Sequence, residues 1–173
     1  MAEVLREAGY ATGHFGKWHL SGVKGEEPAL TADLATAPGN CGFDEWVSAT
    51  NYFDLDPVLW RNGQREQFKG DGSDVATGEA IAFIQRQARK RRAFLAAVWF
   101  GSPHTPHRGL PADRALYPNK ADKIQHYYAE LTGIDRSCGR RCGRRTWPKT
   151  PSSGTAATTA GTPAPYRTAI SGA

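Results

Sequence analysis

The chain has 173 residues, of which 39% are hydrophobic and 23% are charged. These values are typical of a globular domain with its own core, and no run approaches the roughly 18 apolar residues of a membrane span. Three cysteines are too few for a disulfide framework. The acidic start, Met1-Ala2-Glu3-Val4, is unlike a secretory signal, and the sequence leaves the location of the protein open.

The formal net charge of +5 would by itself suggest a nucleic acid or another acidic partner. The charge is unevenly distributed, because residues 138–173 contain six basic residues and no acidic one. Residues 1–137 therefore carry 16 basic against 17 acidic groups and are nearly neutral. We expect no nucleic-acid partner for this body, and a non-catalytic nucleic-acid binder that uses the basic tail remains an alternative.

The first half of the chain predicts short elements joined by long connections. Residues 2–8 have the pattern of an amphipathic helix, and residues 10–15 read as a strand. Residues 21–42 lack periodicity and form a long loop, which in a compact domain is usually functional or mobile. Extended structure resumes at residues 42–47 and 51–53, and Asn62-Gly63 indicates a hairpin at an exposed edge.

The second half predicts a helix, a buried strand and another helix. Ser73-Asp74 caps the first helix, and residues 93–100 are apolar on both faces, which is typical of a central parallel strand covered on both sides. Residues 120–136 have helical periodicity again. This order predicts an α/β domain whose mainly parallel sheet is flanked by helices.

Two polar clusters follow the two clearest strands. Gly16-Lys17-Trp18-His19 ends the first, and a segment with His104 between two prolines ends the second. Ligands of open α/β sheets bind beyond the carboxyl ends of the strands, so we expect both clusters to share one site. A lysine and two imidazoles could bind a tetrahedral anion, stabilise charge on its oxygens and protonate a leaving group.

The remaining histidines have a more ordinary interpretation. His14, His107 and His126 are each typical of a hydrogen-bonded residue without a chemical role. His104 and His107 have the spacing of metal ligands, but no carboxylate or cysteine is near them in the sequence. We therefore assign no metal ligand in this chain.

Three segments carry a resemblance to a known family. Residues 5–20, which include Gly9-Tyr10, Thr12 and Gly16-Lys17-Trp18-His19, look like the second signature of the sulfatase family. Residues 100–106 are similar to that family's later Pro-His-Thr-Pro segment, and residues 127–137 resemble the helix that follows it. The resemblance covers residues 2–137.

This resemblance implies an alkaline-phosphatase-like α/β fold and hydrolysis of a sulfate ester, either a small molecule or a sulfated glycan. The family's nucleophile is a formylglycine beside a calcium ion held by carboxylates. By the resemblance, Lys17 and His19 contact the sulfate and the formylglycine hydrate, and His104 contacts the sulfate and assists departure of the leaving group. Trp18 is expected to be a packing residue.

The chain also departs from the family pattern. The Cys/Ser-x-Pro/Ala-x-Arg motif that yields formylglycine is absent, and so are the amino-terminal aspartates that bind calcium. We expect residues 1–137 to be a partial sulfatase catalytic domain, inactive alone, and residues 138–173 to be a basic, low-complexity, disordered tail. A phosphate-ester hydrolase of the same superfamily is the near alternative.

The composition of the tail suggests a shift of reading frame near Ser137. Codons for residues 150–160, reread in another frame, permit Thr-Leu-Leu-Trp-Tyr-Cys-Ser-Asp-Asn-Gly, which is the metal segment of the family at this distance. We predict that the nucleotide sequence spells Asp-Asn-Gly in that frame. A stop codon before the segment, or a different spelling, would contradict the prediction.

Overall fold

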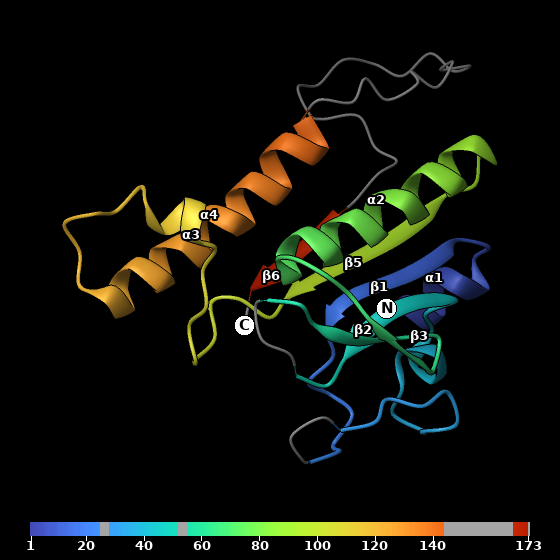
Figure 1. Cartoon of the computed structure of the whole chain (residues 1–173). Helices are drawn as coiled ribbons and strands as arrows, with labels where there is room; N and C mark the ends of the chain where they lie inside the picture. Colours follow the sequence, from blue (N-terminus) through green and yellow to red (C-terminus); the bar gives the residue numbers. More distant parts are fainter. Residues whose placement is uncertain (25–27, 52–54, 144–167, 173) are drawn as a thin grey trace.

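The computed structural model describes residues 1–24, 28–51, 55–143 and 168–172 of the chain (Figure 1). Its elements, in order, are α1 (Ala2–Glu7), β1 (Ala11–Lys17), the 3-10 turn η1 (Pro38–Cys41), β2 (Glu45–Ala49), β3 (Val58–Arg61), β4 (Gln64–Gln67), α2 (Gly72–Arg89), β5 (Phe94–Phe100), α3 (Pro111–Arg114), α4 (Asp122–Gly143) and β6 (Thr168–Gly172).

The strands form one sheet in the order β4-β3-β2-β1-β5-β6. β1 pairs in parallel with both β2 and β5, and β5 pairs in parallel with β6. β3 and β4 extend the sheet as an antiparallel hairpin, with β4 at the edge. The predicted α/β fold with a mainly parallel sheet is therefore confirmed, as is the hairpin at Asn62-Gly63.

The two faces of β5 explain why this strand is apolar throughout. Its residues alternate between two hydrophobic clusters, because successive side chains of a strand point to opposite faces. Phe94, Ala96, Val98 and Phe100 belong to the cluster that includes Phe83 of α2. Leu95 and Ala97 belong to the cluster that includes Ala2 of α1. α2 covers one face of the sheet and α1 lies on the other (Figure 1).

The described part of the long loop, residues 21–24 and 28–42, also covers the second face. Leu30 and Ala37 are fully buried and pack in one cluster with Trp18 and Trp46. Part of the loop is therefore packed against the sheet, and its expected function or mobility stays a prediction. Its regular structure within the described residues is limited to the 3-10 turn η1.

The cap of α2 differs from the predicted one. Asp71, not Ser73-Asp74, is the N-cap residue: its Oδ1 accepts hydrogen bonds from the amide nitrogens of Ser73 at 2.8 Å and Asp74 at 3.4 Å. An aspartate in extended conformation just before a helix reaches the second and third helical amides. Several consecutive residues of the sequence could cap this helix. Asp71 is the cap because its backbone is extended and α2 begins at the next residue.

Polar contacts hold α4 against the start of α2. The Nη1 atom of Arg136 lies 2.5 Å from the carboxylate of Asp113, and Ser137 donates a hydrogen bond of 2.7 Å to Asp74. The partly buried guanidinium lies among three carboxylates, and its hydrogen bonds to Asp113 raise the pKa of Arg136 above its usual value. The single guanidinium offsets part of the negative charge of Asp71, Asp74 and Asp113 at the junction of α2, α3 and α4.

Helix and strand are both found within the segment expected to be a disordered tail. α4 continues past Ser137 to Gly143, and residues 168–172 form β6 beside β5. β6 pairs with the side of β5 that does not face β1, so β5 has a neighbour on both sides. Residues 144–167 and 173 lie outside the described residues, and the division of the chain at residue 137 stays a proposal.

None of the helices in the described ranges is long and apolar enough to cross a membrane.

His14 is a core residue of β1. Its side chain is fully buried, and the rings of Trp18, Phe43 and Trp99 meet it edge-on at centroid distances of 4.8 to 5.3 Å. Nδ1 lies 2.7 Å from the hydroxyl of Ser48, and Nε2 has no hydrogen-bond partner in the described part of the chain. Burial lowers the pKa of His14 to about 3, so the ring is neutral at physiological pH.

We predict that the free energy of unfolding falls as the pH drops below about 6.5. In the unfolded chain His14 binds a proton below that pH, whereas the folded ring stays neutral down to about pH 3. The expected loss is roughly 1.4 kcal/mol per pH unit, measured by urea unfolding at pH 7 and pH 5. The control is His14→Asn, whose amide can still reach Ser48 but does not titrate. Equal pH dependence in both proteins would contradict the prediction.

Candidate functional site

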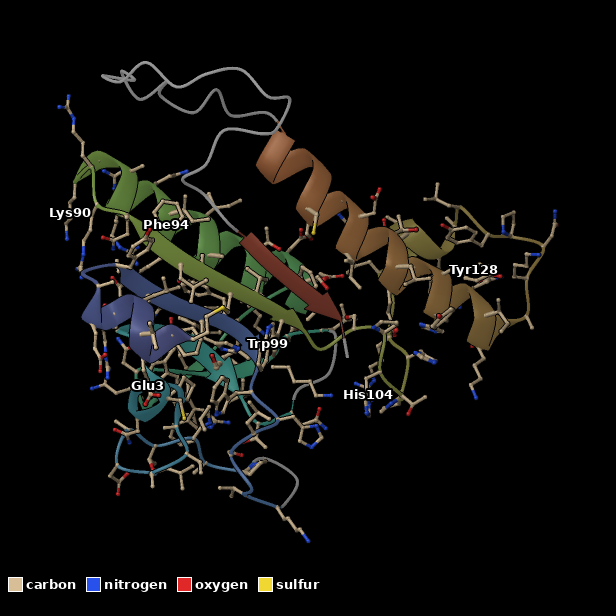
Figure 2. The ribbon with its side chains drawn as sticks, turned by 180° about the vertical axis from the view of Figure 1, so that it is seen from behind. Glu3, Lys90, Phe94, Trp99, His104 and Tyr128 are labelled. Atoms are coloured by element: carbon tan, nitrogen blue, oxygen red, sulfur yellow. The ribbon has the colours of Figure 1, made fainter. Side chains whose placement is uncertain are left out.

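The two predicted polar clusters lie at the same end of the sheet. Lys17 is the last residue of β1 and is aligned with Ala49 of β2, while Gly16 is aligned with Trp99 near the end of β5. Since these strands are parallel, their carboxyl ends meet at one edge. Figure 2 shows His104 in the loop beyond β5, and Lys90 at the opposite end of the molecule.

Lys17 is a buried cation with no protein partner in the described ranges. It is 5% exposed and, within those ranges, makes neither a hydrogen bond nor an ion pair. Burial lowers the pKa of Lys17 below its usual value. Its Nζ atom is not fully enclosed by protein atoms, so a ligand can reach it from solvent. An ammonium group in this position costs folding free energy unless an anion binds beside it.

Gly16 has an unusual backbone conformation just before Lys17. Gly16 has a φ of 106°, a value that residues other than glycine rarely adopt. The next residue, Lys17, is still part of β1, and the amide of Trp18 donates a hydrogen bond of 2.6 Å to the carbonyl of Ala49. The strand thus extends two residues further than predicted, because β2 continues to pair with it.

Trp18 is a packing residue, as predicted. It is 3% exposed, its Nε1 donates to the carbonyl of Thr36 at 2.7 Å, and its ring stacks on Trp99 with a centroid distance of 5.6 Å. His19 follows directly and is exposed. Burial of Trp18 therefore fixes where the chain leaves the sheet, and Lys17 and His19 lie on either side of that fixed point.

His104 has one ring nitrogen occupied and the other available. Its Nδ1 lies 2.6 Å from the carbonyl oxygen of Thr105. A carbonyl only accepts hydrogen bonds, so Nδ1 carries the proton and Nε2 is left for a ligand. The peptide bonds before Pro103 and Pro106 are cis. Lys17, His19 and His104 make no side-chain hydrogen bonds to one another in this part of the structure, which leaves their free atoms available to bind a ligand.

The donor set at this edge does not fit calcium. Within the described ranges, no group of three or more His, Cys, Asp or Glu side chains is placed to hold a metal. Calcium takes six to eight oxygen ligands, whereas residues 17–24 and 101–112 contain no carboxylate. These segments offer positive charge and hydrogen-bond donors, which suit an anion.

The other histidines are hydrogen-bonded, as their ordinary interpretation predicted. His14 bonds to Ser48 within the sheet, and Nδ1 of His126 in α4 accepts the amide of Gly109 at 3.1 Å. Nδ1 of His107 lies 2.9 Å from a carboxylate oxygen of Glu130 in α4. Of the three, His107 alone lies in a loop, since the other two belong to β1 and α4.

Glu130 was not predicted to matter, although the sequence contains a signal for it. This carboxylate is 1% exposed and accepts the amide of Arg108 at 2.5 Å besides contacting His107. In α4 it falls between Tyr127 and Ile134, at the helical spacing of the apolar side of that helix. A carboxylate on a buried helical stripe needs a partner, and here the partner is the loop that carries His104.

The comparisons with known proteins identify the family of the chain. The chain matches the family described as Sulfatase over residues 1–140. It is 30% identical over 159 residues to an ulvan-active sulfatase from Formosa agariphila, with 80% of this chain and 30% of that protein covered.

Solved structures give the same fold. The structure of Ps i-CgsB in complex with k-i-k-neocarrahexaose superposes with a TM-score of 0.69 at 23% identity, covering 82% of this chain and 35% of that one. BT4656 in complex with its substrate D-glucosamine-2-N,6-O-disulfate gives a TM-score of 0.51 at 26% identity, covering 69% and 22%. The chain thus spans about a third or less of these relatives, and by its match over residues 1–140 it belongs to the sulfatase family.

Proposed function

We propose that this chain forms the cationic side of the substrate site in a sulfuric ester hydrolase. The observation that carries the proposal is Lys17, a buried ammonium group without a counter-charge in the described ranges, at the carboxyl end of a central parallel strand. A protein retains such a group at a cost in stability, and a bound sulfate would compensate its charge.

Each of the three residues has a distinct part in this proposal. Lys17 binds a sulfate oxygen as a point charge. His19 supplies a second donor from the exposed side of the strand end. His104, through its free Nε2, contacts the sulfate and passes a proton to the leaving oxygen when the ring is protonated. None of these steps uses the formylglycine or the calcium of the family, because the residues of this chain supply charge and no attacking group.

The substrate class we propose is a sulfated glycan. The relatives support this choice, because one is an ulvan-active sulfatase and one structure contains a substrate that is a disulfated glucosamine. In this chain, an exposed His19 and a half-buried His104 leave the site open to a bulky ester. No observation favours a phosphate ester or a nucleic acid.

Lys17→Met tests the proposal, because it keeps the aliphatic stem and removes the charge. We expect the affinity for inorganic sulfate, measured by isothermal titration against chloride of equal ionic strength, to fall at least about tenfold. Without sulfate, the variant should be more stable to urea by about 1–3 kcal/mol, because an unpaired buried charge is gone.

The matched control is Lys90→Met, which removes the same charge from an exposed position at the other end of the sheet. It should change neither sulfate affinity nor stability by a comparable amount. Unchanged sulfate binding in Lys17→Met would overturn the proposed function. A loss of stability in that variant would show that Lys17 has a structural partner instead.

A further inference from the structure

The loop after β5 contains basic residues and no acidic residue. Residues 101–112 contain His104, His107 and Arg108 and no acidic residue. Arg108 is exposed, and its guanidinium makes no ion pair or hydrogen bond with the described part of the chain. Two half-buried arginines elsewhere are paired, Arg61 with Glu79 and Arg136 with Asp113. The guanidinium of Arg108 is therefore available to a ligand from solvent.

A buried carboxylate holds the loop in one orientation. Glu130 accepts the amide of Arg108 and contacts Nδ1 of His107, whose side chain is 12% exposed and whose ring meets Tyr127 edge-on at 5.2 Å. With Nδ1 occupied, Nε2 of His107 is left without a partner in the described ranges and is not enclosed. In its imidazolium form, His107 donates from both nitrogens, to Glu130 and to a ligand.

Gly109 adds a second attachment on the other side of Arg108. Its amide donates to His126, and a Cβ at this position would overlap the Cβ of Ala129 and lie 2.8 Å from the carbonyl of His126. Loop and α4 are thus in close backbone contact at residues 107–109. The side chain of Arg108 starts from a fixed backbone and not from a freely moving loop, which reduces the entropy that binding would cost.

The geometry points to a second anion subsite, formed by Nε2 of His107 and the guanidinium of Arg108 and oriented by Glu130. This inference rests on the proposed function, since the subsite serves the ester bound at Lys17, His19 and His104. His104 and His107 are three residues apart, so their Cα atoms are separated by no more than about 11 Å. That distance suits a second acidic group on the same or the next sugar. The substrate is accordingly a glycan with at least two anionic groups.

Two probes that differ by one sulfate test the subsite in the full chain. N-acetylglucosamine-6-O-sulfate offers one anionic group and no charged amine, and glucosamine-2-N,6-O-disulfate offers two anionic groups. We expect the wild-type chain to bind the disulfate about tenfold more tightly, as charge-assisted hydrogen bonds are stronger than neutral ones. Isothermal titration with both probes gives the ratio of the two dissociation constants.

Two variants remove the subsite in different ways. Arg108→Ala removes the guanidinium and leaves the amide that bonds to Glu130. His107→Asn retains a donor to Glu130 and removes Nε2. Each should reduce the ratio of affinities to near one while the affinity for the monosulfate stays within about twofold. Lys90→Ala, which removes an exposed cation far from the loop, is the control and should preserve the ratio.

The outcomes separate the two proposals. Equal affinity of the wild-type chain for both probes, or an equal loss for both probes in Arg108→Ala, would overturn the subsite. Disulfate binding that depends on Arg108 but not on Lys17 would overturn the proposed function alone. Failure to bind either probe would overturn both.

Discussion

The stacking of Trp18 on Trp99 connects the two halves of the site. The rings lie 13° from parallel with their centroids 5.6 Å apart, at the ends of β1 and β5. The indole of Trp18 is fixed further by its hydrogen bond to Thr36. Such aromatic pairs contribute about 0.5–1.5 kcal/mol beyond the area they bury. Lys17 and His19 flank one ring and the His104 loop begins just after the other, so this contact joins the two segments.

Burial has different consequences for two polar residues of β1. Burial keeps the imidazole of His14 neutral, so the three aromatic rings around it enclose no charge. Three residues further along β1, the same burial acts on Lys17, whose charge is not matched in the described ranges. A hydrophobic side chain would serve the fold better there. A bound anion, as proposed above, would compensate this charge.

Most of the site segments could be predicted because their signals are local. A strand followed by Gly-Lys-Trp-His, and an apolar strand followed by a proline-flanked histidine, are visible in a few residues each. Glu130 could not be assigned in the same way. Its partners are His107 and the Arg108 amide, more than twenty residues earlier, and only the packing of α4 against the loop brings them together. The N-cap at Asp71 was missed for a smaller reason, since adjacent polar residues compete equally in sequence.

The sequence by itself determined the α/β class, the two cationic segments and the family, because hydrophobic periodicity and short motifs are properties of neighbouring residues. Only the tertiary structure showed that His14 lies in the core, that His107 is held by Glu130, and that His104 has one ring nitrogen open to a ligand. That distinction depends on burial and on partners distant in sequence: Ser48 for His14, Glu130 for His107 and, close by, the carbonyl of Thr105 for His104. It also showed that Lys17 is buried, since a residue's exposure at a strand end is set by the helix and loop that cover the sheet.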